Sequence, residues 1–197
     1  MLYYTIETSL QTLVSTLDAT QLFIFDERGI KGINSVNETR RLETRASYAL
    51  LYRLLTTHGL LPDGVRPQIA HHEHGKPYLF DYPEIRFNLS HCRRAVAAAV
   101  CTDGEVGIDI ESRRRMSDGL LHKVCSDEEI ATITAAADPE IEFLRFWTSK
   151  EALLKKIGTG IDRDLRPLLR PDSPILQGLT LKSIPQPEID GYLSICY

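Results

Sequence analysis

The chain has 197 residues, of which 43% are hydrophobic and 25% are charged. That balance is typical of a folded globular protein and excludes disordered, collagen-like and membrane-spanning chains. Acidic residues outnumber basic ones by 27 to 23, and the net charge of -4 argues against a protein that wraps nucleic acid. We therefore expect no nucleic-acid partner, although a local basic patch stays compatible with this charge. At roughly 150 residues per domain, the length fits one domain or two small ones.

The cysteines and the N-terminus indicate a reducing compartment. Cys92, Cys101, Cys125 and Cys196 are far apart and include no C-x-x-C pair, so neither a zinc knuckle nor a disulfide framework is indicated. The N-terminus lacks the regions of a signal peptide, and no apolar run approaches the ~18 residues of a membrane helix. We expect a soluble cytoplasmic protein with no membrane association.

The first half of the chain predicts a strand followed by a long helix. Residues 22–25 form a short apolar run that predicts a buried strand ending in a turn at residues 26–29. Ser35 and Glu38 have the spacing of a capping box, and apolar residues then recur at helical spacing until residues 58–59. We expect the helix to begin at this box.

Short strands follow from residue 85. Apolar and polar residues alternate over 85–89 and 106–110, on either side of a run of small apolar residues at 95–101. Asp103 and Gly104 separate the second and third of these segments and are typical of a hairpin. We expect an antiparallel meander of three strands.

The last third of the chain predicts helices and then strands, which makes the fold class α+β. Ser126 and Glu129 form a second capping box. Asp138, followed by a proline and an acidic first turn, predicts the start of a long helix that runs to about Ile157. The remaining expected features are helix-ending glycines at 158 and 160 and strands at 175–184 and 189–196.

Two carboxylates share one face of a predicted strand. In residues 106–111 the apolar side chains face one side, so Gly107, Asp109 and Glu111 face the other. The carboxylates lie roughly 6.6 Å apart along the strand, and a hard divalent cation would relieve their repulsion. For an isolated D-x-E the alternative is a solvated face of an edge strand. Gly107 favours the close approach of a ligand or of another backbone segment.

A second set of charges lies on or beside the apolar stripe of the helix expected from residue 139. At ~100° per residue, Lys150 falls inside the stripe, while Glu151 and Lys155 fall on its border. A lysine so placed usually extends its ammonium group to solvent, and that alternative stays open. A metal-bound anion would suit all three charges. Asp109, Glu111 and Glu151 therefore form a candidate Mg²⁺ site. Lys150 and Lys155 would be available for phosphate.

Three shorter stretches carry weaker signals. Residues 87–91, Phe-Asn-Leu-Ser-His, end a predicted strand with a hydroxyl and an imidazole, although a polar turn is the simpler explanation of this stretch alone. Residues 75–77, Gly-Lys-Pro, are similarly consistent with a turn that carries a solvated lysine. Histidines at 71, 72 and 74 lack the partner spacing of a zinc site and indicate a flexible polar loop.

Taken together, four stretches between about residues 70 and 160 resemble the 4′-phosphopantetheinyl transferases of the single-chain, two-subdomain type. Each stretch is weak alone, but their order and separation match the family, and the ordered set is specific. The two ends of the chain carry little resemblance. The four stretches are Gly75-Lys-Pro77, Phe87-Asn-Leu-Ser-His91, Gly107-Ile-Asp-Ile-Glu111, and Phe143-x-x-x-Trp147-Thr-x-Lys-Glu-Ala152-x-x-Lys155 with Gly158-x-Gly160.

The resemblance implies a fold and a reaction. The fold would be two similar α/β subdomains related by a pseudo-twofold axis, residues 1–105 with coenzyme A contacts and residues 106–197 with the metal-binding strand and catalytic helix. The active site would lie in the cleft between them. The reaction would be Mg²⁺-dependent transfer of 4′-phosphopantetheine from coenzyme A to a serine of an apo acyl or peptidyl carrier protein, releasing adenosine 3′,5′-bisphosphate. We expect the enzyme to be a monomer.

The resemblance also implies roles for the charged residues of the second subdomain. Asp109, Glu111 and Glu151 would hold Mg²⁺. Lys155 and His91 would contact the pyrophosphate of coenzyme A. Attack on a dianionic pyrophosphate depends on alignment and on neutralisation of charge, which these groups would supply. Glu151, or a water held by the metal, is the candidate base for the serine proton, and we favour Glu151.

The remaining roles concern coenzyme A. Lys150 would assist Lys155 at the phosphates. Ser90, Lys76 and Arg45 would lie along the adenosine 3′-phosphate end, with Arg45 resting on a looser match. Carrier proteins of this class are acidic, so Arg113 to Arg115 are expected to supply a basic docking surface, with a solvated turn as the alternative.

Two other functions share part of this pattern. A metal-dependent phosphodiesterase or nuclease also uses carboxylates and a lysine, but it leaves residues 75–77 and 87–91 unexplained. A non-catalytic coenzyme A-binding module is the second alternative. The presence of Asp109, Glu111, Glu151 and Lys155 together argues against it.

Overall fold

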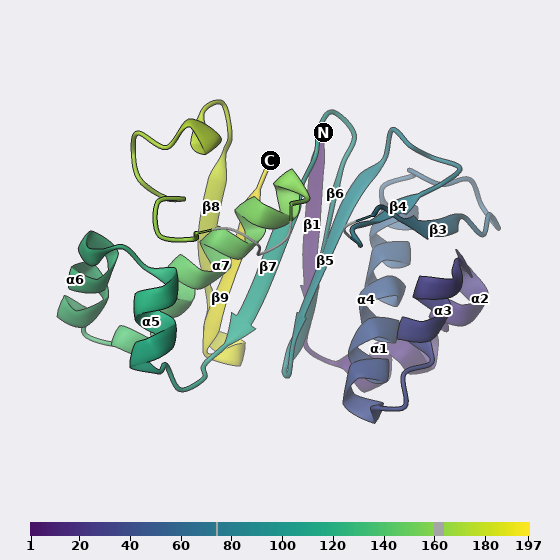
Figure 1. Cartoon of the computed structure of the whole chain (residues 1–197). Coiled ribbons are helices and arrows are strands. Elements are labelled where there is room, and N and C mark those ends of the chain that lie inside the picture. The colour runs from purple at the N-terminus through teal and green to yellow at the C-terminus, as the bar shows by residue number, and fades with distance from the viewer. Residues whose placement is uncertain (74, 160–163) are drawn as a thin grey trace.

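The computed structural model describes residues 1–73, 75–159 and 164–197, which combine helices with three small sheets in an α+β fold (Figure 1). None of the described helices is both long and apolar enough to cross a membrane. All four cysteines are buried free thiols.

The elements of the first half are β1 (Leu2–Glu7), α1 (Leu10–Thr16), α2 (Ala19–Leu22), β2 (Ile24–Phe25), α3 (Glu27–Ile33), α4 (Glu38–Thr57), β3 (Gln68–His71), β4 (Pro77–Leu79), β5 (Arg86–Cys92) and β6 (Ala95–Cys101). The elements of the second half are β7 (Gly107–Ser112), α5 (Asp118–Val124), α6 (Asp127–Ala135), α7 (Pro139–Ile157), β8 (Leu181–Gln186) and β9 (Gly191–Cys196), with short 3₁₀ turns at Pro174–Leu176 and Pro187–Ile189. The sheets have the strand orders β1-β6-β5, β2-β3-β4 and β7-β9-β8.

The long helix α4 is confirmed, but its start and the strand before it differ from the prediction. Asn37 caps the helix by accepting a hydrogen bond from the Arg40 N–H, so the spacing of Ser35 and Glu38 does not form a capping box. Residue 22 ends the short helix α2, and the strand β2 is only two residues long. The expected turn at 26–29 is instead the start of α3, because the Asp26 carboxylate accepts the Gly29 N–H and caps that helix.

The antiparallel pairing of β5 with β6 is confirmed, but the predicted meander is wrong at its third strand. β6 pairs on its other edge with β1, and β7 pairs with β9. Every residue of β6 is buried, since this strand is the centre of its sheet and is covered on both faces. Because both edges of β6 are occupied, β7 cannot join it, and Asp103 and Gly104 lie in a connection between two different sheets.

In the second half of the chain, the helices begin and end close to where the sequence predicts. Ser126 and Glu129 form the predicted capping box of α6. Asp138 caps α7 with a proline at its start, and Gly158 ends that helix in the left-handed conformation at a φ of 78°; Gly160 lies outside the described residues. Strand β9 fits the prediction, whereas the expected strand at 175–184 is wrong over its first part. A 3₁₀ turn occupies that part, and β8 begins at Leu181.

The main body is built in four layers, α4, the β1-β6-β5 sheet, the β7-β9-β8 sheet and α7 (Figure 1). Small side chains of β6, such as Ala97 and Ala99, pack against Ile108, Ile110 and Ile195 of the facing sheet and form a core shared by both. Two further cores lie under the helices, and among the described residues one is built from residues before 101 and the other from residues after 115. This arrangement brings the end of β5 beside β7.

Candidate active site

The strand β7 divides its side chains as the alternation predicts. Ile108 and Ile110 are fully buried in the core between the sheets. Asp109, only 5% exposed, lies on the opposite face, which α7 covers. The expectation of a solvated edge-strand face is therefore wrong for Asp109, because a helix lies over it.

Gly107 allows α7 to lie against β7. A Cβ atom on this residue would overlap the carbonyl oxygen of Ala152 and the backbone nitrogen of Lys156. The predicted close approach is thus one of helix backbone to strand backbone. As a result, Glu151 and Lys155 lie over the strand that carries Asp109.

Asp109, Lys155 and Ser90 form one hydrogen-bonded group. Lys155 Nζ donates to Asp109 Oδ1 at 2.7 Å and to Ser90 Oγ at 3.0 Å. Ser90 Oγ in turn donates to Asp109 Oδ1 at 2.8 Å. A buried carboxylate is stable only when it is paired and hydrogen-bonded, and this group supplies both for one of the two oxygens of Asp109.

Residues 87–91 are strand residues whose polar side chains join the two sheets, which excludes the polar-turn alternative. Asn88 Oδ1 accepts the Ile108 N–H at 2.9 Å, and Ser90 Oγ accepts the Ile110 N–H at 3.3 Å. These side chains satisfy the free edge of β7 in place of a neighbouring strand. The role of Asn88 was not predicted, although its alternation with Phe87 and Leu89 was the signal that pointed to it.

Two carboxylate oxygens of the site have no hydrogen-bond partner. Asp109 Oδ2 and Glu151 Oε1 are both buried and unpaired in the described part of the chain. Burial, followed by the negative charge of Asp109, raises the pKa of Glu151 to about 7. The same two causes, in the same order, raise the pKa of Glu111. Removing a carboxylate from water favours its protonated form, so the site holds more negative charge than its own lysine neutralises.

These oxygens fit a hard divalent cation in their chemistry. Unpaired buried carboxylate oxygens are the ligands that Mg²⁺ and Ca²⁺ prefer, and a cation would supply the missing partners. Within residues 1–73, 75–159 and 164–197, no three His, Cys, Asp or Glu side chains converge into a preformed metal-binding group. β7 and α7 therefore bring these carboxylates near enough that, in addition to burial, the charge of Asp109 raises the pKa of Glu111 and Glu151, without a preformed metal-binding group among the described residues.

Lys150 does not belong to this group, which contradicts its predicted contact with phosphate. Its side chain is fully buried, and Nζ donates to Glu129 Oε2 at 2.6 Å and to the Val124 carbonyl at 2.7 Å. The helical position inside the apolar stripe correctly indicated burial. Its partner is a carboxylate that also accepts the Ser126 N–H in the capping box of α6, so both expected alternatives, phosphate contact and solvent exposure, are wrong.

The other predicted coenzyme A residues lie in three different surroundings. His91 is exposed at the rim, with Nδ1 3.2 Å from Glu43 Oε2. Lys76 Nζ lies 2.6 Å from Glu105 Oε2 and donates to the Lys156 carbonyl at 3.2 Å, near the end of α7. Arg45 Nε donates to the Ile33 carbonyl at 3.0 Å. Of the predicted coenzyme A residues, Ser90 and Lys155 are the ones that the structure shows bonded to Asp109. Glu105, the partner of Lys76, was not predicted.

The three arginines after β7 differ from one another. Arg113 is held by Asp138, Glu140 and Asp190, so it is not the free cation that was expected. The Arg114 guanidinium lies 5.0 Å from the ring centre of Trp147, and Arg115 is exposed.

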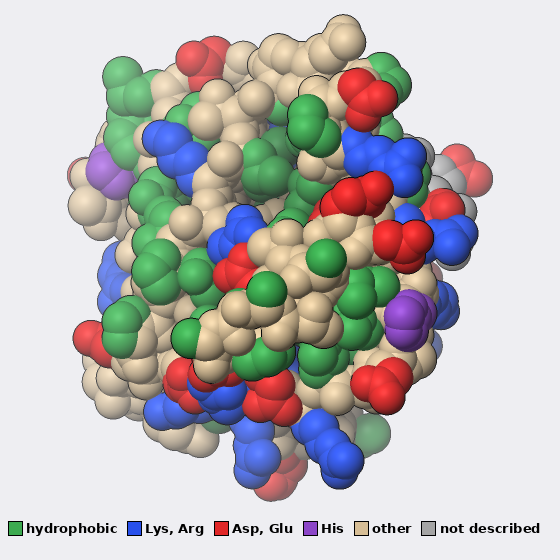
Figure 2. Space-filling view, turned by 90° about the vertical axis from the view of Figure 1, so that its left-hand side faces the viewer, with side chains coloured by type: hydrophobic (Ala, Val, Ile, Leu, Met, Phe, Trp, Pro, Cys, Tyr) green, Lys and Arg blue, Asp and Glu red, His purple; other side chains and the backbone are tan. Residues whose placement is uncertain are grey.

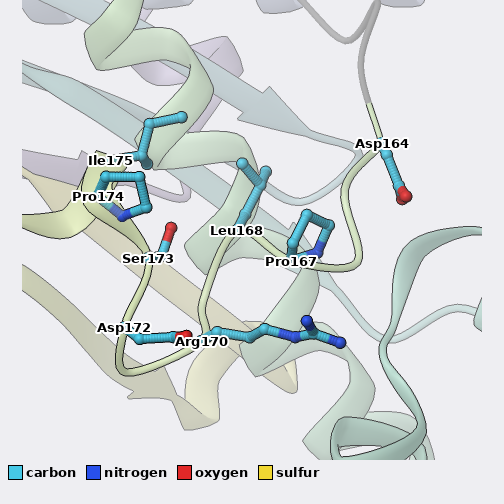
Figure 3. A pocket seen from close by; sticks show the side chains of 8 residues that line it. All are labelled: Asp164, Pro167, Leu168, Arg170, Asp172, Ser173, Pro174 and Ile175. Atoms are coloured by element: carbon cyan, nitrogen blue, oxygen red, sulfur yellow. The ribbon is translucent and has the colours of Figure 1, made fainter.

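A separate cavity of about 340 Å³ lies in the segment between Asp164 and Ile175 (Figure 3). Its lining, which includes Leu168 and Arg170, contains none of the predicted site residues. It is therefore distinct from the group around Asp109.

Comparison with known proteins finds similarity to one family. Residues 105–179 match the model of the 4′-phosphopantetheinyl transferase superfamily. The chain is 38% identical over 110 residues to the 4′-phosphopantetheinyl transferase AcpT of Escherichia coli K12, covering 54% of this chain and 55% of that protein. It is 31% identical over 110 residues to a 4′-phosphopantetheinyl transferase of Bacillus subtilis, covering 55% of this chain and 48% of that protein.

A longer match extends into both halves of the chain. The chain is 31% identical over 168 residues to the 4′-phosphopantetheinyl transferase HetI of Nostoc sp., covering 79% of this chain and 65% of that protein. With AcpT and the Bacillus protein, the chain matches about half of each relative's own length. Over these matched regions, the chain is similar to the 4′-phosphopantetheinyl transferases.

Proposed function

We propose that this protein transfers the 4′-phosphopantetheine group of coenzyme A to a serine hydroxyl of an apo carrier protein. In this reaction the serine oxygen forms a bond to the β-phosphorus of coenzyme A. The bond between that phosphorus and the bridging oxygen breaks, and adenosine 3′,5′-bisphosphate leaves. The observation that carries the proposal is the group of Asp109, Glu151 and Lys155, in which one buried oxygen of each carboxylate has no hydrogen-bond partner among the described residues.

The residues that would hold Mg²⁺ are Asp109, Glu111 and Glu151. Bound there, Mg²⁺ would neutralise the pyrophosphate and stabilise the charge that develops on the leaving oxygen. Support comes from Asp109 Oδ2 and Glu151 Oε1, which are buried without hydrogen-bond partners in the part of the chain that the structure describes, and from the raised pKa of Glu151 and Glu111. Both observations indicate excess negative charge in the absence of a cation.

Lys155 would bind the pyrophosphate from the side of α7. Its side chain is about a quarter exposed, and its ammonium group is held by Asp109 and Ser90, so it stays oriented before substrate arrives. An oriented cation loses little entropy on binding and is aligned with the reacting phosphorus. His91, at the rim of the same group, would also contact the pyrophosphate. Lys76, near the end of α7, would contact the adenosine 3′-phosphate end of coenzyme A.

Glu151 is the residue that would take the serine proton. A base is most effective when its pKa lies near the working pH, and burial raises the pKa of Glu151 to about 7. If one carboxylate served as both ligand and base, the bound cation would lower its basicity. A metal-held water is therefore the second candidate for this role.

The carrier would bind through local positive charge, since the chain as a whole is acidic. Arg114 and Arg115 follow the metal strand β7 and are the basic residues proposed for this contact. Basic and acidic side chains are interspersed over the face that carries α5 and α6 (Figure 2). A carrier would therefore be recognised by a few placed arginines rather than by one broad basic surface.

We further propose that residues 1–105 and 106–197 are pseudo-twofold-related subdomains of a cytoplasmic monomer. In support, each part contributes one three-stranded sheet to the centre, and each covers its sheet with one long helix, α4 of 20 residues and α7 of 19 residues.

The test is a transfer assay by mass spectrometry. The purified protein, coenzyme A and Mg²⁺ are incubated with a panel of apo fatty-acid, polyketide and peptide carrier proteins. We expect one carrier or more to gain the mass of phosphopantetheine, and no gain on any of them would refute the proposal. Asp109→Ala should abolish transfer with the fold intact, whereas Asp63→Ala, at an exposed carboxylate, should not change it. If the protein hydrolyses a phosphodiester and transfers nothing, the result would favour a phosphodiesterase. If it binds coenzyme A without catalysing any reaction, the result would favour a binding module.

A further inference from the structure

Four hydroxyl groups meet beneath the part of α7 that carries Glu151. Thr148 and Ser149 belong to α7, Ser194 to β9 and Ser183 to β8. Ser194 Oγ lies 2.8 Å from Thr148 Oγ1 and 2.9 Å from Ser183 Oγ, and Ser149 Oγ lies 2.7 Å from Ser183 Oγ. Thr148 and Ser194 are fully buried and Ser149 is nearly so. We call these four side chains the hydroxyl cluster.

The hydroxyl cluster continues the row of side chains that contains Asp109. Ser194 is the direct partner of Asp109 across β7 and β9, and Ser183 is the direct partner of Ser194 across β9 and β8. Directly opposite residues of antiparallel strands point to the same face, so one polar row crosses the whole sheet. The helix α7 lies across this face (Figure 1).

Glu151 lies between two points where α7 is held to the sheet. One turn before it, Thr148 bonds to Ser194. Directly after it, the backbone at Ala152 lies against Gly107. Asp109 is held through Oδ1 by Ser90 and by Lys155 of the same helix, whereas Glu151 Oε1 and Asp109 Oδ2 have no hydrogen-bond partner within the described ranges. The distance between Glu151 and Asp109 therefore depends on how α7 is seated on the sheet.

The contacts that seat the helix are directional. Small side chains such as serine and threonine do not interlock in the way that large apolar ones do. A buried hydroxyl, however, must keep its partner, and a satisfied buried network therefore specifies one arrangement. A slide of α7 along the strands would break several of these bonds together.

We propose that Thr148 and Ser194 are positioning residues that hold Glu151 at the distance from Asp109 that cation binding requires. This inference rests on the proposed function, because it assumes that these carboxylates share a divalent cation. Neither hydroxyl touches the cation or the substrate. Their effect would pass through the seat of α7, one step farther from the cation than that of groups bonded directly to metal ligands.

The test measures cation affinity directly. Mn²⁺, a spectroscopic probe for a Mg²⁺ site, is titrated into the metal-free protein without coenzyme A, and the free ion is followed by electron paramagnetic resonance. Thr148→Val removes the hydroxyl and keeps the side-chain shape. Ser194→Ala removes the hydroxyl that bonds to Thr148, and Thr148→Ser keeps a hydroxyl at position 148. The matched control is Thr134→Val on α6, whose Oγ1 bonds the carbonyl four residues back at 2.8 Å, as that of Thr148 does at 2.9 Å.

We expect Thr148→Val and Ser194→Ala each to weaken Mn²⁺ binding by about tenfold or more, the range seen when partners behind metal ligands are lost. Thr148→Ser and Thr134→Val should stay within about twofold of the wild type. Circular dichroism identifies a variant that fails to fold. If either Thr148→Val or Ser194→Ala does not fold, the Mn²⁺ affinity of the other variant tests the inference. Unchanged Mn²⁺ affinity in a folded Thr148→Val or Ser194→Ala variant would overturn this inference and leave the proposed metal site standing. Absence of Mn²⁺ binding by the wild type would overturn both the inference and the proposed metal site.

Discussion

Lys150 Nζ donates a hydrogen bond to Glu129 Oε2 at 2.6 Å, although Lys150 is the immediate neighbour of Glu151 on α7. Adjacent helical residues point about 100° apart, so one faces the candidate active site and the other the core beneath α6. The pair connects the helix of the site to the capping box of α6. Its contribution is therefore expected in folding rather than in substrate binding.

Replacing Lys150 tests this assignment. Lys150→Met leaves the Glu129 carboxylate buried without its cation, and we expect the free energy of unfolding to fall by about 3–5 kcal/mol. Urea denaturation measures the loss. The double variant Lys150→Met/Glu129→Leu should recover part of it, because no unpaired charge remains. Lys123→Met, at an exposed lysine of α5, is the control. A folded Lys150→Met protein of unchanged stability but with a raised KM for coenzyme A would contradict the assignment.

Gly107 offers a test of how closely α7 must approach β7. In Gly107→Ala the new methyl group overlaps the helix backbone at Ala152 and Lys156, so α7 must move away from the strand. We expect a loss of about 1–3 kcal/mol in unfolding free energy, or more. We also expect transfer activity to fall under conditions in which the variant is still folded, since Glu151 moves with the helix.

Gly104→Ala is the matched control for this substitution. No atom lies within 4 Å of a Cβ placed on Gly104, so the change should stay within about 0.5 kcal/mol. Equal effects of the two substitutions on urea denaturation and on transfer would show that the close approach of α7 has no special importance.

The helices of the second half could be predicted because their signals are local. The Ser126 and Glu129 box, the Asp138 cap and the αL glycine at 158 each act within one turn of the chain. Strand pairing is not local. One of the two partners of β6 is β1, about ninety residues earlier in sequence. The hairpin signal at Asp103 and Gly104 is overridden because β1 and β5 occupy both edges of β6.

The site was predictable to the extent that periodicity defines faces. Alternation along β7 correctly placed Asp109 opposite the core, and the helical projection correctly placed Glu151 and Lys155 at the border of the apolar stripe. Periodicity does not name the neighbour that a face meets. Lys150 was expected at a phosphate, and its partner Glu129 lies on another helix, at a position that tertiary packing alone determines.

We expect Arg115 and Arg113, which follow β7, to contribute differently to carrier binding. Arg115 is exposed, whereas Arg113 is already neutralised by Asp138, Glu140 and Asp190. Arg115→Glu should therefore raise the KM for an acidic carrier several-fold, with a smaller change in the KM for coenzyme A, and added salt should reduce the difference from wild type. Arg113→Gln should leave the KM for the carrier near the wild-type value. A larger effect from Arg113→Gln would place the carrier on the other side of this turn.

Glu151 makes stability depend on pH in a direction that can be checked. Burial and the charge of Asp109 raise the pKa of Glu151 from 4.5 to about 7 in the folded protein. Between these values the folded state binds more protons than the unfolded state, so the free energy of unfolding falls as pH rises. Over the whole interval the fall from this residue is roughly 3 kcal/mol. The stabilisation is fully present below pH 4.5 and lost above about pH 7.

Urea denaturation of the metal-free protein at several pH values between 5 and 7.5 should show this fall, and Glu151→Gln should reduce it because glutamine does not titrate. Saturating MgCl₂ should also reduce the fall in the wild type, since a bound cation favours the ionised carboxylate and lowers its pKa. Mg²⁺ should have little effect on Glu151→Gln. A wild-type curve that keeps the same slope with and without Mg²⁺ would show that the cation does not bind at Glu151.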